Sequence, residues 1–166
     1  MLLKPLRYLA QALAAQDSPR RLAAGFALGA FAGLIPKSSL FAQIALMLIA
    51  ALQVNAAAGY CSAALFSLLA PVLDPLTHRI GLFFLTGIPA LGPLWTRLYN
   101  LPVAPWTGFN NTVTLGSVIV GAIVLYPFYK LMTPVFARYS ETLGARIRRF
   151  KVTQLLLGAD TAGRFS

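Results

Sequence analysis

Long apolar stretches, separated by short polar or proline-containing turns, make up most of this chain. Its uncharged runs extend from Arg21 to Lys37, from Lys37 to Asp74 and from Arg97 to Lys130. Runs of this length need either a very large core or a bilayer around them, and a chain of 166 residues is too short to enclose such a core. The pattern therefore predicts an all-α, polytopic integral membrane protein.

The first two apolar segments are short for membrane spans. They cover residues 20–35 and 40–54, with a turn at 36–39 between them. As a helix, the 14 residues from 22 to 35 extend only ~21 Å, against ~30 Å for the hydrocarbon core of a bilayer. Two interpretations stay open, namely two thin, tilted spans or one re-entrant hairpin whose tip is the turn. The lengths favour the hairpin.

The later segments repeat this alternation. Residues 56–73 and 109–130 are long enough to be predicted as spans, whereas residues 75–100 contain breaks typical of a second hairpin. A hairpin followed by a span, occurring twice in opposite orientations, is the arrangement of an inverted repeat. The breaks are Gly87, Pro89, Gly92 and Pro93, and residues typical of a membrane interface follow them: Trp95, Arg97, Tyr99 and Trp106.

Three dipeptides combine a capping side chain with proline, the combination typical of a helix start. They are Ser18-Pro19, Asp74-Pro75 and Thr133-Pro134. Proline at the first helical position loses no intrahelical hydrogen bond. We predict a new helix after each dipeptide, and we interpret three further polar residues at segment edges as caps: Asn55, Asn110 and Asn111.

Both ends of the chain are basic. The predicted single membrane domain, residues 1–166, begins with an interfacial amphipathic helix at 3–16, continues through an embedded core at 18–130 and ends in a basic amphipathic tail at 131–166. Lys and Arg are concentrated before and after the core, so the positive-inside rule predicts that both termini are cytoplasmic. An inner-membrane, multi-pass location follows.

Composition narrows the classes of function. The formal charge of +10 flanks apolar runs and does not form a solvated face interleaved with aromatic residues, which argues for membrane lipids and against nucleic acid as partner. With four acidic residues and one histidine, the chain offers no catalytic triad, metal-spaced cluster or phosphate-binding loop. We expect no enzyme activity, no cofactor and no metal.

Gly25, Gly29 and Gly33 form a double G-x-x-x-G pattern in the first apolar segment. Four-residue spacing places the glycines along one helix face, where another helix backbone can approach closely. The pattern favours packing within the chain, and it also fits a homo-oligomer.

Two groups of polar residues are candidate ligand-binding sites. In the first, Lys37, Ser38 and Ser39 would bind an anion such as a lipid phosphate if the turn is a re-entrant tip. The alternative is a loop at the far interface, with the lysine extending to headgroups. The second group is Asp74, His78 and Arg79, to which Arg97 is added from the next segment.

The second group also has two interpretations. As the N-cap of a helix beginning at Pro75, Asp74 would satisfy backbone donors and pair with His78 one turn later. Such clusters are functional if they lie within the membrane, and capping explains them if they lie at the interface. The capping interpretation is favoured.

Several of these motifs resemble one bacterial family. Ser18-Pro19, the stretch from Gly25 to Gly29, the stretch from Gly33 to Pro36, Asn55 and the stretch from Asp74 to Thr77 are similar to the family named domain of unknown function twenty sixty-two, and the segment 109–111 resembles its small stand-alone members. The family pattern often has Asn where this chain has Asp74. The resemblance implies a bacterial inner-membrane location and no known activity, and relatives fused to a glycosyltransferase point to lipid-linked substrates.

Two functions follow as hypotheses. The first is the handling or translocation of a lipid or lipid-linked anion, alone or as a subunit of an envelope transport complex. The second is a non-transporting anchor or assembly partner for another envelope protein. A polar cavity lined by Lys37 or Arg97 would favour the first function, and a dry helix bundle with the glycines exposed would favour the second.

Overall fold

The computed structural model describes residues 18–149, with side chains described for 18–138, and this part of the chain consists of helices joined by short turns, with no strand. The all-α prediction is therefore confirmed for the described residues. The predicted interfacial helix at 3–16 and the end of the predicted tail lie outside them. The helices and helical turns are α2 (Pro19–Leu34), α3 (Leu40–Ala51), α4 (Ala56–Leu82), η1 (Phe83–Gly87), η2 (Pro89–Leu91), α5 (Gly92–Tyr99), η3 (Ala104–Thr107) and α6 (Thr112–Arg149).

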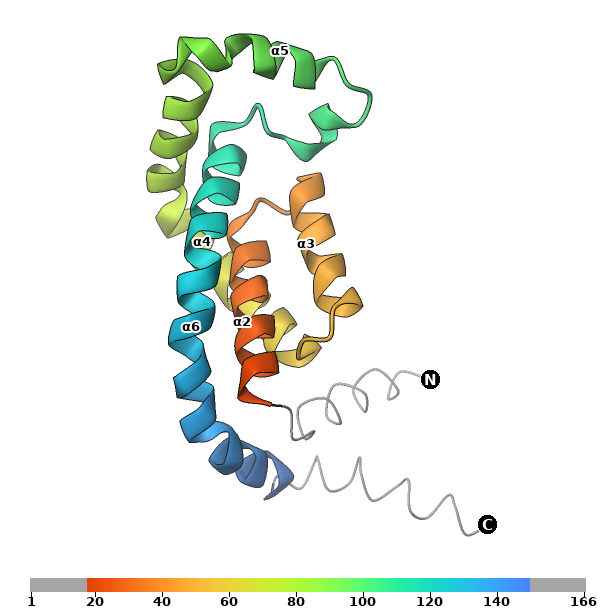
Figure 1. Ribbon diagram of the computed structural model, residues 1–166, viewed down its shortest axis with the longest axis vertical. Coiled ribbons are helices and arrows are strands. Elements are labelled where there is room, and N and C mark those ends of the chain that lie inside the picture. Colours follow the sequence, from red (N-terminus) through yellow and green to blue (C-terminus); the bar gives the residue numbers. More distant parts are fainter. Residues whose placement is uncertain (1–17, 150–166) are drawn as a thin grey trace, which may run out of the picture.

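Helices α2, α4 and α6 form the core and pack against one another in all three pairings (Figure 1). Alanines and glycines on α2 are buried in these contacts, so the three backbones approach closely. Helix α3 packs against α2 and α4 through a narrow buried stripe, which consists of Ala42, Ala45 and Ile49. The rest of α3 is therefore left largely without a partner inside the chain.

The two ends of this bundle differ. Helix α2 begins and α6 ends at the same end of the molecule, while α5 crosses the opposite end (Figure 1). The turn between α2 and α3 stops short of α5 along the long axis of the molecule. The α2–α3 hairpin is thus shorter than the bundle that it packs against.

Several helix starts follow from capping side chains. Ser18 is the N-cap of α2 and accepts a hydrogen bond from the Arg21 backbone, with Pro19 at the next position. Asn55 caps α4 through Ala58 N at 2.7 Å. Before α6, Asn111 accepts from Thr114 N, and Asn110 is exposed. The predicted start at Ser18 and the capping roles of Asn55 and Asn111 are confirmed.

Two predicted helix starts are wrong. Helix α4 continues through both Pro71 and Pro75, and α6 continues through both Pro127 and Pro134. Proline inside a helix removes one backbone hydrogen bond and bends the axis, but packing and side-chain hydroxyls can hold the helix together. Thr77 Oγ1 donates to Asp74 O at 3.1 Å, close to the break at Pro75.

The segment after α4 differs from the predicted hairpin at 75–100. Helix α4 runs to Leu82, and a π-helical turn then ends at Gly87, at the predicted glycine and proline breaks. Helix α5 does not return along α4 but lies across the end of the bundle (Figure 1). A hydrogen bond from Trp95 Nε1 on α5 to Phe84 O, at 3.1 Å, holds α5 in this position.

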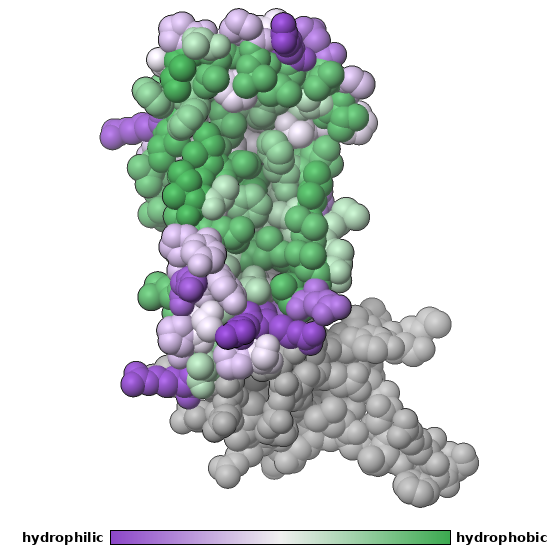
Figure 2. Space-filling model, in the orientation of Figure 1, coloured by the Kyte–Doolittle hydropathy of each residue, from purple (hydrophilic) through white to green (hydrophobic). Residues whose placement is uncertain are grey.

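Two helical stretches are long and apolar enough to cross a membrane, Ala56–Thr86 and Thr112–Arg138. Only 22% and 28% of the residues in their most apolar windows are buried. A core helix of a soluble protein would be mostly buried, whereas here Leu68 and Val72 are 79% and 77% exposed. Figure 2 shows the result, a broad apolar band with hydrophilic residues gathered beyond its ends.

Candidate functional site

The glycines of α2 face α4 at close range. A Cβ added at Gly29 would overlap the carbonyl oxygen of Gly59, and one at Gly25 would overlap the carbonyl oxygen of Asn55. At Gly33 the added atom would lie 2.6 Å from the Cβ of Phe66. All three glycines are buried within the chain. They are therefore not exposed for a partner in this structure.

A second close crossing, which none of the predicted motifs indicated, joins α4 to α6. A Cβ at Gly81 would overlap the carbonyl oxygen of Thr112, and one at Gly116 would overlap that of Thr77. Both helices carry the same pattern here, a threonine followed four residues later by glycine. Small residues at this spacing are the signal that would have found the crossing.

Lys37 folds back onto the end of α2. Its Nζ donates to the carbonyl oxygens of Ala32 at 2.7 Å and of Gly33 and Ile35 at 2.8 Å each. The last carbonyls of a helix lack intrahelical donors, so a lysine at this position satisfies them and complements the helix dipole. The three protons of the ammonium are thereby used inside the chain, which leaves little for an anion at this turn.

The two serines of the turn have different surroundings. Ser39 is 3% exposed, caps α3 through Phe41 N, and donates its hydroxyl to Thr107 O. This last bond attaches the tip of the hairpin to η3. Ser38 is exposed. The turn is thus held at Ser39 by the segment that follows α5.

The residues of the second predicted group, Asp74, His78, Arg79 and Arg97, do not come together in one site. His78 Nδ1 pairs with Thr112 Oγ1 at 2.6 Å and makes no hydrogen bond to Asp74, so the predicted pairing is wrong. Asp74 forms no ion pair with a described residue, and Arg79 is exposed on α4. Arg97 is exposed on α5. No three His, Cys, Asp or Glu side chains gather into a metal-binding group within residues 18–138.

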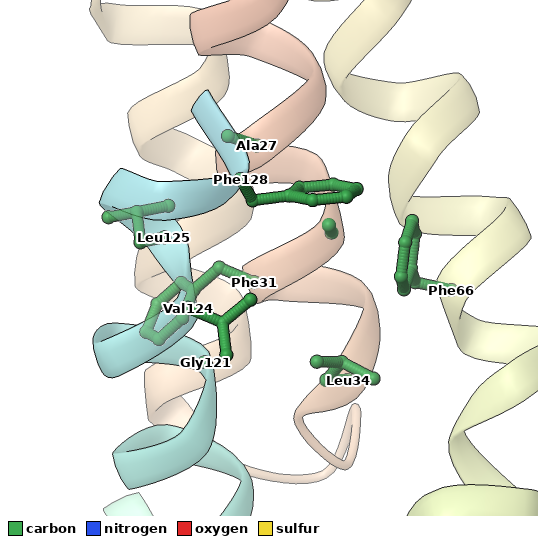
Figure 3. Close-up of a pocket in the computed structure, with 9 residues that line it drawn as sticks. Ala27, Phe31, Leu34, Phe66, Gly121, Val124, Leu125 and Phe128 are labelled. Carbon is green, nitrogen blue, oxygen red and sulfur yellow. The ribbon is translucent and has the colours of Figure 1, made fainter. Parts of the chain in front are cut away.

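An apolar groove opens between the three core helices. It is open to its surroundings, its empty volume of about 280 Å³ includes that open space, and neither Lys37 nor Arg97 lines it. Figure 3 shows Phe128 reaching from α6 toward Phe66 on α4, across the face of α2. The lining residues are Ala27, Ala30, Phe31, Leu34, Phe66, Gly121, Val124, Leu125 and Phe128. A groove with this lining can bind a hydrocarbon chain, but it offers no groups for polar chemistry.

An aromatic cluster closes one end of the groove. The rings of Phe66 and Phe128 meet edge to face with centroids 5.6 Å apart, and Phe26 lies 5.7 Å from Phe128. Phe136 continues the cluster at 5.7 Å from Phe26. Such contacts favour defined ring orientations, so this end of the groove is well defined. No sequence motif marked these residues, because they come from three distant segments.

Two fully buried serines give a matched test of the packing. Ser62 Oγ donates to Phe26 O at 2.7 Å, whereas Ser117 Oγ has no hydrogen-bond partner. We expect Ser62→Ala to destabilise the protein by about 1 kcal/mol, and Ser117→Ala to be neutral or to stabilise it by about 1 kcal/mol, because a buried unpaired hydroxyl is costly. Thermal unfolding in detergent measures both variants. If Ser117→Ala lost as much stability as Ser62→Ala, the conclusion that Ser62 forms a buried hydrogen bond and Ser117 does not would be contradicted.

Comparisons with known proteins agree with the sequence motifs. The model of a family described as "Uncharacterized protein conserved in bacteria (DUF2062)" matches residues 3–142. An uncharacterized protein of Treponema pallidum (strain Nichols) is 26% identical over 163 residues, covering 98% of this chain and 100% of the relative. No solved structure matches the chain.

Proposed function

We propose that this chain, which belongs to the bacterial family DUF2062, is an integral inner-membrane protein that holds a lipid by its hydrocarbon chain. The observation that carries the lipid-binding proposal is the apolar groove between α2, α4 and α6. The groove lies on uncharged stretches of all three helices. If the helices lie in a bilayer, the molecule that occupies the groove would be a lipid chain. We therefore prefer the lipid-handling hypothesis to the hypothesis of a non-transporting anchor.

The membrane assignment rests on exposed apolar surface and helix length. The 27 residues of α4 extend ~40 Å, enough to cross a ~30 Å hydrocarbon core with some tilt. The 16 and 12 residues of α2 and α3 extend only ~24 and ~18 Å. We therefore assign two crossings to α4 and α6, and a re-entrant hairpin to α2 and α3.

Hydrogen bonding at the hairpin tip supports this assignment. A re-entrant turn needs its backbone groups satisfied by protein, since lipid offers no hydrogen bonds. Lys37 donates hydrogen bonds to carbonyls at the end of α2, and Ser39 donates one to the carbonyl of Thr107. In this proposal Lys37 stabilises the tip and is not the anion site.

Orientation follows from the exposed basic residues. Arg20 and Arg21 lie at the start of α2, Lys130 lies at the middle of α6, and Arg138 lies in its second half. The positive-inside rule places this end in the cytoplasm. Two crossings then put the start of α2 and the end of α6 on the same side, in agreement with their positions in Figure 1.

Filling the groove should release the lipid. Ala30 is 5% exposed and lines the groove, so Ala30→Phe places a ring where the hydrocarbon chain would lie. Losing on the order of ten van der Waals contacts costs ~1–2 kcal/mol, so we expect about tenfold less retained lipid. Native mass spectrometry of protein released from detergent counts the lipids that stay bound.

Ala64→Phe is the matched control, because Ala64 is exposed on α4 outside the groove. It adds the same bulk and should leave retention unchanged. Equal retention by wild type and both variants would contradict the groove as a lipid site and would leave the anchor role as the better explanation.

A further inference from the structure

Helix α4 is tightly packed at its two ends and loosely packed between them. Its buried residues all lie at positions 57–63 or 77–81. Residues 64–76 include no buried residue, and the large side chains of Leu68 and Val72 in this stretch are exposed. We call residues 67–76 the middle segment of α4. The other core helices therefore hold the middle segment less firmly than they hold the two ends of α4.

Two prolines also weaken the backbone of the middle segment. Pro71 and Pro75 have no N–H, so the carbonyls of Ser67 and Pro71 lose the donors that a regular helix would give them. In Figure 1 the yellow first half of α4 runs at a slant behind α2, whereas its green second half runs upright. A bend of this kind is what interior prolines cause, and fewer backbone hydrogen bonds resist a change in its angle.

The two packed ends of α4 are attached to different walls of the groove. The first end holds α2, because Gly29 and Gly59 bring the two backbones together. The second end holds α6 in the same way, through Gly81 and Gly116. Helices α2 and α6 supply all the lining residues of the groove except Phe66. Since each end of α4 stays with its own wall, a movement of one wall away from the other has to be taken up in the middle segment.

We propose that the middle segment of α4 is a hinge, and that bending there moves Phe66 away from Phe128 and opens the groove for a lipid chain to enter or leave. This inference rests on the proposed lipid-binding function and adds how the site is opened. Phe66 lies directly before the middle segment, and its ring meets that of Phe128 on α6 with centroids 5.6 Å apart. A single ring pair is a weak contact, so it breaks and forms again without unfolding the helices.

Restoring the missing hydrogen bonds tests the hinge. The double variant Pro71→Ala/Pro75→Ala supplies both absent N–H groups and stiffens α4, and both positions are exposed, so the packed ends are kept. Full-length protein that carries bound lipid is mixed with detergent micelles of phosphatidylethanolamine with deuterated acyl chains, and native mass spectrometry follows the exchange of lipid with time. We expect exchange to slow by about fivefold for each hydrogen bond that bending must break again, which corresponds to ~1 kcal/mol per bond. The final amount of bound lipid should stay the same.

Pro134→Ala is the matched control, because Pro134 is an exposed interior proline of α6 that does not line the groove. It should exchange lipid at the wild-type rate. The single variants Pro71→Ala and Pro75→Ala should each give an intermediate rate, and they carry the test if the double variant folds poorly.

Spin labels measure the movement itself, without reference to lipid. Met47 on α3 and Ile123 on α6 are 70% and 69% exposed, and α3 packs against α2, so their distance follows the separation of α2 from α6. Nitroxides are attached to Met47→Cys and Ile123→Cys in a Cys61→Ala background, and their distance is measured by pulsed electron paramagnetic resonance. We expect a broad distance distribution that narrows in the double proline variant and stays broad in Pro134→Ala.

The two measurements separate failure of the hinge from failure of the lipid site. Equal exchange rates in the wild type and the double proline variant would overturn the hinge as the gate of the groove and leave the lipid-binding function standing. Absence of retained lipid in the wild type would overturn the proposed function itself. An unchanged distance distribution in the double variant would show that α4 does not bend at the middle segment, and would overturn the hinge whatever the lipid data show.

Discussion

Gly29→Leu is expected to abolish the folded protein in detergent. A Cβ at this position would overlap the backbone oxygen of Gly59 and would lie 2.9 Å from the Cβ of Ser62. A backbone oxygen cannot rotate away as a side chain does, so α2 and α4 must separate along their whole contact. Overpacking of a core typically costs ~1–3 kcal/mol, and we expect at least ~3 kcal/mol here because the backbone itself must move.

The measurement is the yield of monodisperse protein by size-exclusion chromatography, followed by thermal unfolding. Gly92→Leu is the matched control, since a Cβ at Gly92 meets no atom within 4 Å. It adds the same side chain at another helical glycine and should fold at wild-type yield. A Gly29→Leu protein that unfolds at the wild-type temperature would show that α2 and α4 do not pack through this face.

The first half of the fold was predictable because its signals are local. Ser18 and Asn55 carry capping side chains immediately before apolar runs, and each accepts the expected backbone hydrogen bond. The turn at 36–39 combines a proline with polar residues, and it separates α2 from α3 as predicted. In both cases a few adjacent residues determine the local structure.

The second half was less predictable because distant packing decides it. Asp74-Pro75 has the composition of a helix start, but α4 passes through it. Gly81 contacts the backbone of α6 one turn beyond Thr77, and this contact holds the helix across the break. A dipeptide does not reveal whether a second helix lies against it.

The candidate site differs from the predicted one for two reasons, one local and one that depends on distant packing. Lys37 was predicted either to bind an anion at a re-entrant tip or to extend to headgroups from an interfacial loop, whereas in the structure its ammonium donates to three carbonyls at the end of α2. The groove was not predicted at all, since Phe31, Phe66 and Phe128 are apolar residues like their neighbours in sequence. Only the crossing of three helices makes them a site.

The position of the hairpin tip relative to the membrane is the central claim of the proposed membrane architecture. Ser38 is the best position at which to test the depth of the hairpin tip. Its side chain is exposed, and replacing it leaves the hydrogen bonds of Lys37 and Ser39 in place. We predict that Ser38→Cys, in a Cys61→Ala background, reacts with a membrane-impermeant thiol reagent at least about tenfold more slowly than an exposed cysteine in water, because water is scarce at that depth.

Two reference positions calibrate the labelling rates in intact and permeabilised cells. Asn100→Cys, exposed just after α5, should react quickly from outside, and Arg20→Cys should react only after permeabilisation. Slow labelling of Ser38→Cys under both conditions is the result expected for a re-entrant tip. Labelling from outside as fast as that of Asn100→Cys would mean that α2 and α3 both cross the membrane, and would contradict the proposed architecture.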